Sequence, residues 1–249
     1  MTGSLVVVGT GPGRAELMTP ASAAAVARAT DLVGYGPYLD RIPSTRPDQC
    51  RHASDNRVEL DRARHALALA AAGRHVAVVS GGDPGVFAMA VAVFEAVEAG
   101  DPLWRTLDIR VEPGVTAMLA AAAEVGAPLG GDFCAISLSD NLKAWATIER
   151  RLSAAAEADF VIALYNPASK ARPHQLGDAL ALLRSKKKAE TPVLFVRAAG
   201  TTDTKVVATT LGAADASVAD MRTLVIIGAS TTRQVGRWIY TPRGERGAS

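Results

Sequence analysis

The segment Ser80-Gly81-Gly82-Asp83-Pro84-Gly85 offers the clearest ligand-binding chemistry in the sequence. Glycines leave backbone N–H and C=O groups uncovered, so a ligand can approach the main chain closely. Asp83 adds a carboxylate, which could contact a ligand or cap a helix whose first turn contains Pro84. We expect ligand contact here, with capping as a second role of Asp83, because capping alone does not explain the two preceding glycines.

The elements around this segment are expected to place it at the end of a strand. Val76–Val79 is a short apolar run, typical of a buried strand in a parallel sheet. Apolar residues then recur at helical spacing from Val86 to Val97, and Gly100 ends the pattern. In open α/β sheets ligands bind at the carboxyl ends of the strands, which is where this strand-to-helix turn would lie.

A second glycine-rich turn, Gly9-Thr10-Gly11-Pro12-Gly13, follows the first predicted strand. The dinucleotide-binding fingerprint needs a further glycine where Arg14 stands, and the next helix is expected only from Pro20, with Thr19 as its cap. No Gly-Lys-Ser/Thr follows, so a phosphate-binding loop is also excluded. The glycines therefore predict that another group packs closely against the main chain at Pro12. The alternative is a tight turn with a purely structural role.

The alternation of strand and helix patterns predicts two α/β domains, 1–114 and 115–249, with a ligand cleft between them. The first should hold a largely parallel sheet. The second should hold a mixed sheet, because some of its strands are joined by linkers too short for a helix. The segment from the second strand to about Arg57 is expected to be irregular.

Strands are predicted at 5–8, 31–35, 76–79, 107–111, 133–138, 160–164, 193–197, 206–210, 224–227 and 238–240. Helices are predicted at 21–29, 57–72, 86–97, 118–124, 142–156 and 173–187.

Composition limits the classes of function. The 249 residues carry a formal net charge of +2 and 5% aromatic residues, which does not indicate nucleic-acid binding but suits a small anionic substrate. Cys50 and Cys134 lack metal-ligand spacing, so we expect reduced thiols and no metal site. Leu5–Val8 is too short for the apolar core of a secretion signal, and no apolar stretch could span a bilayer. We therefore expect a cytoplasmic protein that binds no membrane.

Four motifs together resemble the tetrapyrrole methylases: VGTGPG at 8–13, SGGDPGVFA at 80–88, EPGVTAMLAAAA at 112–123 and ALYNP at 163–167. The resemblance covers essentially the whole chain. It implies an S-adenosylmethionine-dependent enzyme of two α/β domains that forms a homodimer. Further segments are similar to the branch that methylates precorrin-3B at ring carbon 17, with contraction of the macrocycle to precorrin-4, in cobalamin biosynthesis: SLSDNLKAW at 137–145, LYNPASKARPHQL at 164–176, VVATTLGAA at 206–214 and TLVIIGAS at 223–230.

The resemblance also implies a set of cofactor contacts. Two positions depart from the branch, since Ala198-Ala199-Gly200-Thr201 stands where Asn-Ala-Gly-Arg is more usual, and Gly81 is often serine there. These departures concern individual contacts rather than the identity of the cofactor. By matching positions, S-adenosylmethionine would contact Pro12, Gly81, Gly82, Asp83, Val86, Thr116, Ala117, Asn166 and Gly200.

The implied chemistry is methyl transfer from a sulfonium to a ring carbon. Holding donor and acceptor in line contributes on the order of 7–11 kcal/mol in well-oriented models and needs no metal. Ring contraction also moves protons. Asp140, at the end of a predicted strand, is a hypothetical acid/base, and capping of the next helix by Asp140 or Asn141 is the alternative. Arg14, Lys143 and Lys170 are candidate partners for peripheral carboxylates, each alternatively a solvated charge.

Several other functions stay open. The acceptor could be another precorrin, its cobalt-bearing counterpart, or an RNA ribose, although an RNA enzyme should carry a basic stripe with stacking aromatics. A nicotinamide-dependent oxidoreductase would need an acidic residue closing the second strand, whereas Gly34-Tyr35 ends it. A module that binds the cofactor without turnover is the remaining class.

Overall fold

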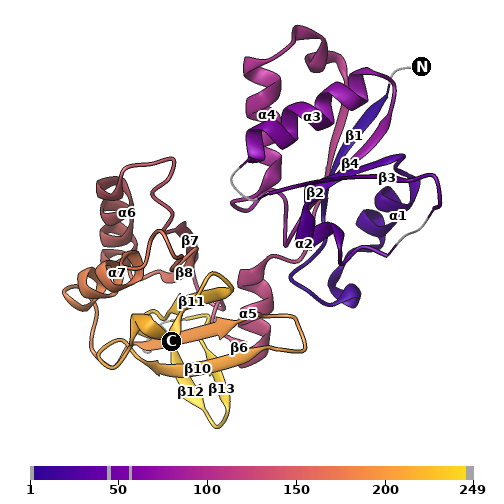
Figure 1. Cartoon of the computed structure of the whole chain (residues 1–249). Helices are drawn as coiled ribbons and strands as arrows, with labels where there is room; N and C mark the ends of the chain where they lie inside the picture. Colours follow the sequence, from indigo (N-terminus) through magenta and orange to yellow (C-terminus); the bar gives the residue numbers. More distant parts are fainter. Residues whose placement is uncertain (1–2, 44–45, 56–57, 245–249) are drawn as a thin grey trace. The chain divides into compact units, whose positions relative to one another are not determined.

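The structure is a computed structural model that describes residues 3–43, 46–55 and 58–244 (Figure 1). The chain divides into two compact units, Met1–Ala117 and Met118–Ser249. The predicted boundary, after residue 114, lies close to this division. Arg57, where the second predicted helix was to begin, lies outside the described residues.

The first unit is built on a five-stranded sheet with strand order β3-β2-β4-β1-β5. Every neighbouring pair is parallel, which confirms the predicted parallel sheet. The central strands are the apolar runs of the sequence, and β4 is buried from Val76 to Ser80. The strands are β1 (Ser4–Gly9), β2 (Asp31–Tyr35), β3 (Cys50–Ser54), β4 (His75–Ser80) and β5 (Asp108–Glu112).

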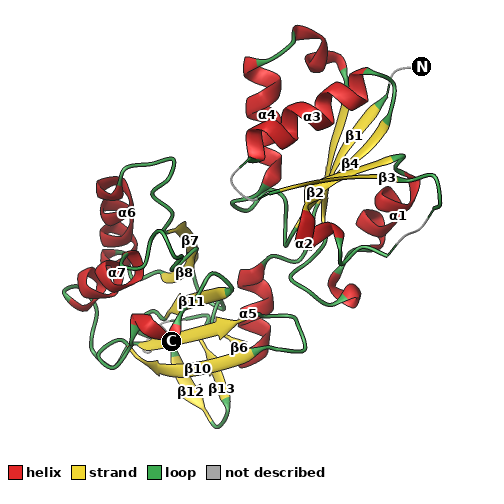
Figure 2. Cartoon of the chain, in the orientation of Figure 1, coloured by secondary structure: helices red, strands yellow, loops and turns green. Residues whose placement is uncertain are grey.

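Helices cover both faces of this sheet (Figure 2). Successive residues of β4 alternate between the two faces: Val76 and Val78 pack with α3 and α4, and Ala77 and Val79 pack with α1 and α2. Thr19 caps α1 as predicted, since its Oγ1 accepts a hydrogen bond from the Ser22 amide at 3.1 Å. The helices are α1 (Pro20–Arg28), α2 (Gly36–Leu39), α3 (Glu59–Ala71) and α4 (Met89–Ala99), with short 3-10 helices at Ala15–Leu17 and Pro102–Thr106.

Two predictions for the first unit were wrong. The segment expected to be irregular contains α2 and β3. Strand β3 lies at the sheet edge and has no buried residue, so its sequence lacks the apolar pattern of a core strand. Helix α4 begins at Met89, later than the apolar spacing from Val86 indicated, and its N-cap Ala88 makes no side-chain capping bond.

The second unit holds a mixed sheet with strand order β10-β9-β11-β8-β7, as predicted. Only β7 and β8 are parallel, and the other three pairs are antiparallel. A small second sheet has the order β12-β13-β6. The strands are β6 (Gly126–Ala127), β7 (Phe133–Ser137), β8 (Val161–Tyr165), β9 (Pro192–Arg197), β10 (Lys205–Thr210), β11 (Thr223–Ile227), β12 (Arg233–Val235) and β13 (Trp238–Tyr240).

The helices of the second unit are α5 (Ala117–Val125), α6 (Trp145–Glu157) and α7 (Gln175–Arg184), with a 3-10 helix at Ala216–Val218. Leu152 of α6 and Leu180 of α7 are buried in the main core, together with Phe195 of β9. Helix α6 begins three residues later than predicted, because Ala144 before it is extended and Leu142 is almost fully exposed. No helix in the described ranges combines the length and apolar character needed to cross a bilayer.

Candidate functional site

The turn after β4 is organised by Asp83. The Asp83 Oδ1 atom accepts a hydrogen bond from the Gly85 amide at 2.8 Å, and Oδ2 accepts one from the Gly114 amide at 3.0 Å. Gly114 lies in the turn after β5, so the carboxylate joins two turns at the carboxyl ends of strands. The prediction that Asp83 caps the following helix is wrong, because α4 begins only at Met89.

The glycine turn after β1 is held against the same segment. Gly82 N donates to Gly11 O at 2.8 Å, and Gly11 N donates to Gly82 O at 3.2 Å. A Cβ atom on Gly114 would lie 2.2 Å from Gly82 O, so no other residue fits there without movement of the backbone. Since β1 lies between β4 and β5 in the sheet, the three turns form one continuous backbone surface at its carboxyl edge.

The remaining candidates of the first unit border this surface. A Cβ atom on Gly82 would lie 3.8 Å from Thr116 Cα and 4.0 Å from Ala117 N, and Thr116 is buried. Gly82 has a φ of 67°, a conformation that favours glycine. The first unit thus brings together seven of the predicted cofactor contacts: Pro12, Gly81, Gly82, Asp83, Val86, Thr116 and Ala117.

The ring of Tyr38, from α2, covers Gly81. A Cβ atom on Gly81 would lie 2.7 Å from Tyr38 Cζ. Arg41 stacks over the same ring, with its guanidinium carbon 5.6 Å from the ring centroid. The close packing gives a physical reason for glycine at position 81, where the resembled branch often has serine.

Asn166 and Gly200, the cofactor candidates of the second unit, follow β8 and β9. Asn166 has a φ of 53°, and its Nδ2 donates to Ser137 Oγ, at the end of β7, at 2.9 Å. Gly200 has a φ of 74°. Because β8 and β9 both run antiparallel to β11, their carboxyl ends lie at the same edge of the sheet.

Asp140, the predicted acid/base, lies after β7 and accepts a hydrogen bond from Gln175 Nε2 at 3.1 Å. Gln175 is buried, with 2% of its surface exposed. Neither Asp140 nor Asn141 caps α6, whose N-cap is Ala144, so the capping alternative is wrong. A buried donor thus holds the Asp140 carboxylate at the carboxyl edge of the sheet.

The three predicted substrate contacts lie in different settings. Arg14 is an exposed residue of the first unit. Lys143 follows β7, and burial, with a smaller contribution from Arg151, lowers the pKa of its amine. Lys170 is exposed in a tight turn closed by reciprocal backbone bonds between Ser169 and Arg172. Arg172 lies in the same motif as Lys170 but was not predicted, because a sequence does not show which cations have anionic partners.

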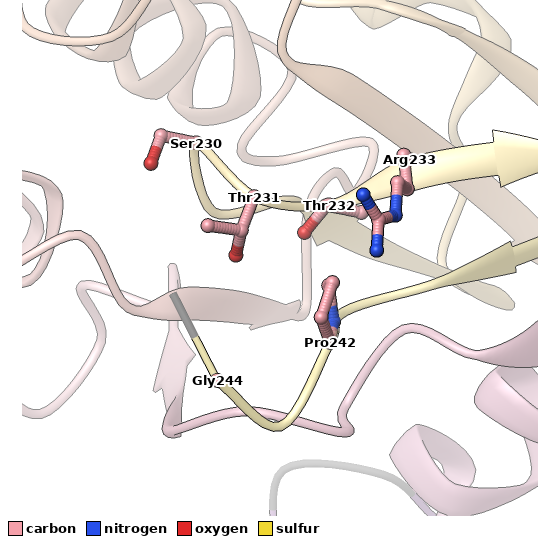
Figure 3. Close-up of a pocket in the computed structure, with 6 residues that line it drawn as sticks. All are labelled: Ser230, Thr231, Thr232, Arg233, Pro242 and Gly244. Atoms are coloured by element: carbon pink, nitrogen blue, oxygen red, sulfur yellow. The ribbon is translucent and has the colours of Figure 1, made fainter. Parts of the chain in front are cut away.

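A cavity of about 260 Å³ lies elsewhere in the second unit (Figure 3). It is lined by residues 230–233, Pro242 and Gly244. Ile227, at the end of β11 just before this cavity, pairs with Ile162 near the start of β8, so the cavity lies away from Asn166. None of the predicted site residues lines it. Among the described residues, no group of three or more His, Cys, Asp or Glu side chains is arranged to hold a metal ion.

The family model of the Tetrapyrrole (Corrin/Porphyrin) Methylases matches residues 4–215. The chain belongs to this family. It is also 62% identical over 254 residues to a precorrin-3B C(17)-methyltransferase from a Sinorhizobium species, and the alignment covers 100% of both chains. The tetrapyrrole methylase motifs identified in the sequence are therefore those of a true family member, and the protein is a methyltransferase.

Solved structures show the same fold. The crystal structure of the methyltransferase CobJ is 55% identical and superposes with a TM-score of 0.94, covering 96% of this chain and 100% of that one. The uroporphyrin-III C-methyl transferase from Thermus thermophilus, complexed with S-adenyl homocysteine, is 21% identical, with a TM-score of 0.66 over 91% of this chain and 92% of that one. This tetrapyrrole methylase therefore has the two-domain α/β fold of CobJ.

Proposed function

We propose that this protein transfers a methyl group from S-adenosylmethionine to carbon 17 of precorrin-3B, with contraction of the macrocycle to precorrin-4, in cobalamin biosynthesis. The observation that carries the proposal is the 62% identity, over the full length of both chains, to a precorrin-3B C(17)-methyltransferase. The sequence segments that resemble this branch of the family lie in both units, so the similarity is not confined to the cofactor motifs.

Two observations support S-adenosylmethionine as the cofactor. The chain belongs to the tetrapyrrole methylase family, and the Thermus relative was solved in complex with S-adenyl homocysteine. The proposed contacts are the nine residues predicted from the sequence. The turns after β1, β4 and β5 are rich in glycine, so a bound cofactor could approach their main chain closely. The amides of Gly11, Gly82, Gly85 and Gly114 already donate hydrogen bonds within these turns, so they do not form a phosphate cradle. Asp83 would act mainly by holding the turns, since both of its carboxylate oxygens already accept backbone amides.

The bound cofactor would supply an activated methyl group, and the protein would hold the acceptor carbon in line with it. Asp140 is the proposed acid/base for the proton transfers of ring contraction. The hydrogen bond from Gln175 would fix the orientation of its carboxylate.

Calorimetric titration tests the cofactor. S-adenosylhomocysteine should bind saturably and NAD(H) should not. Binding of NAD(H) alone would contradict a methylase function and favour an oxidoreductase.

Turnover tests the acceptor. Metal-free precorrin-3B and its cobalt-bearing counterpart should be supplied separately with S-adenosylmethionine, and methylated products detected by mass spectrometry. The proposal predicts a higher kcat/KM with metal-free precorrin-3B. A higher value with the cobalt-bearing compound would change the proposed substrate and leave the methyl transfer intact.

We also propose a cytoplasmic homodimer. The support is the resemblance to a family of homodimers and a composition typical of a globular protein, 49% hydrophobic and 21% charged. Light scattering during size-exclusion chromatography should give twice the mass of one chain, and the mass of a single chain would contradict the dimer.

A further inference from the structure

Arg172 is a covered cation at the edge of the sheet that carries Asn166. Only 9% of its surface is exposed. Its Nη1 donates to Asn166 O across 3.5 Å, which is the one hydrogen bond that the guanidinium makes with the described residues. No described carboxylate forms an ion pair with it. The cation is thus held within the fold without an ion-pair partner among the described residues.

Other arginines of the protein show how unusual this setting is. Arg197 pairs with Asp220 at 2.7 Å, and Arg74 pairs with Asp31 at 2.7 Å. Arg62, which is also buried, forms no ion pair within the described ranges, but it donates to Ser54 Oγ, Met89 Sδ and Asp55 O. Arg172 has no ion pair with a described carboxylate, and its guanidinium makes only the one long hydrogen bond to Asn166 O with the described residues. A guanidinium has five N–H donors and stays charged, and a buried charge without a partner is destabilising.

A backbone bridge holds the main chain from which the Arg172 side chain projects. Ser169 and Arg172 exchange two backbone hydrogen bonds of 3.0 Å, so they are directly opposed residues of an antiparallel bridge. Side chains opposed in this way project to the same side of the bridge. Among the described residues, two side-chain polar atoms are fully buried without a hydrogen-bond partner: Ser169 Oγ and Gln175 Oε1. No Arg172 nitrogen is in this group. The Arg172 nitrogens without a hydrogen bond are therefore not fully enclosed, and the small exposed part of the side chain is where a ligand would reach them.

The charges around Arg172 favour an anionic ligand. Residues 138–144 and 166–174, which follow the parallel strands β7 and β8, contain three cations, Lys143, Lys170 and Arg172, and a single carboxylate, Asp140. Asp140 accepts from Gln175 and is not paired with any of them. Both segments begin at the carboxyl edge of the sheet, and Asn166, a proposed cofactor contact, is the first residue of the second segment.

We propose that Arg172 binds a peripheral carboxylate of the tetrapyrrole substrate through a bidentate ion pair. The inference rests on the proposed function, which supplies a macrocycle with carboxylates around its rim. The planar guanidinium matches a carboxylate with two parallel N–H···O bonds, which a lysine does not provide. Arg172 thereby becomes a substrate-binding residue beyond Arg14, Lys143 and Lys170.

Arg172→Gln should raise the KM for precorrin-3B at least tenfold and leave the Kd for S-adenosylhomocysteine within twofold of wild type. Arg172→Lys keeps the charge but loses the planar geometry, so its KM should be intermediate. Without substrate, the Tm of Arg172→Gln should be equal to or above that of wild type, because the substitution removes an unpaired charge. Arg150→Gln, on an exposed position of α6, is the matched control and should leave KM and Tm unchanged.

The alternative outcomes are distinct. An active wild type with unchanged KM in both Arg172 variants would overturn the assignment of Arg172. A Tm several degrees lower in both variants, with weaker S-adenosylhomocysteine binding, would show a structural role instead and also overturn it. A wild type that binds S-adenosylhomocysteine but does not methylate precorrin-3B would overturn the proposed function, on which the assignment depends.

Discussion

The carboxylate of Asp83 and the amide of Gly114 are joined by a 3.0 Å hydrogen bond that connects the turn after β4 to the turn after β5. The two residues are 31 positions apart in the sequence. The bond makes the shape of one glycine-rich turn dependent on the shape of the other. The turn after β1 is attached to the turn after β4 by two backbone hydrogen bonds between Gly11 and Gly82. The cofactor surface proposed for this tetrapyrrole methylase is therefore one structural unit rather than three independent loops.

Replacing Asp83 should weaken both the fold and cofactor binding. Asp83→Ala leaves the amides of Gly85 and Gly114 without their acceptor. Water can replace the acceptor at the exposed Gly85, whereas the partly buried Gly114 amide is left unsatisfied at a cost of about 1 kcal/mol or more. We expect a loss of about 1 kcal/mol in the free energy of unfolding, measured with urea, and a Kd for S-adenosylhomocysteine at least tenfold higher by calorimetry. Asp83→Asn keeps one acceptor oxygen and should be intermediate. An unchanged Kd in Asp83→Ala would remove this turn from the cofactor site.

Gly114 should tolerate no side chain. Its Cβ atom would lie 2.2 Å from Gly82 O, so Gly114→Ala should force the turns apart and lower the free energy of unfolding by about 3 kcal/mol or more. Gly177→Ala is the matched control. Nothing lies within 4 Å of a Cβ atom there, and alanine in helix α7 should add up to about 1 kcal/mol. Equal unfolding midpoints for the two variants would contradict the close approach of the turns.

Asp31 should make the first unit sensitive to acid. Burial opposes its ionisation, but hydrogen bonds from Arg74, Thr30 and His52 outweigh this and bring the pKa to about 2 from a usual 3.8. Because the folded-state pKa is lowered, the stabilisation is complete above pH 4 and is lost as the pH falls from about 4 to 2. The linkage relation gives about 2 kcal/mol for this shift.

Urea unfolding of Asp31→Asn measures that contribution. The variant should be less stable than wild type by about 2 kcal/mol at pH 7, and the difference should shrink towards pH 2.5. Asp48→Asn, an exposed carboxylate paired with Arg46, is the control and should change stability by less than about 1 kcal/mol. A difference between Asp31→Asn and wild type that does not change with pH would refute the low pKa.

Asp140→Asn tests the proposed acid/base. The amide preserves shape but cannot accept a proton, so formation of the ring-contracted product should fall by about 10²-fold or more. The Kd for S-adenosylhomocysteine should be unchanged, because Asp140 is not among the proposed cofactor contacts. Full ring-contracting activity in the variant would exclude this role for Asp140.

The sequence predicted best what depends on local patterns. The apolar run of β4 identified a buried strand, and Thr19 and Pro20 identified the start of α1, because strand burial and helix capping leave direct signatures in neighbouring residues. Strand β3 was missed since an edge strand needs few apolar residues. The start of α4 was misplaced because Asp-Pro normally begins a helix, whereas here the partner of Asp83 is the distant Gly114.

The candidate site was predictable only in part. Glycine-rich turns at strand ends indicated where a ligand could reach the backbone, and the structure joins the three turns of the first unit. That Gly81 lies against Tyr38, or that no described carboxylate pairs with Arg172, depends on contacts made only in the folded chain. Such contacts arise from tertiary packing, and the spacing of residues along the sequence does not indicate them.

The most direct test of the account uses S-adenosylmethionine labelled with ¹³C in its methyl group and precorrin-3B as the acceptor. The purified protein should transfer the label, and carbon NMR of the product should show it on carbon 17 of a contracted macrocycle. A label on another ring carbon, or no transfer from a protein that binds S-adenosylhomocysteine, would contradict the proposed function.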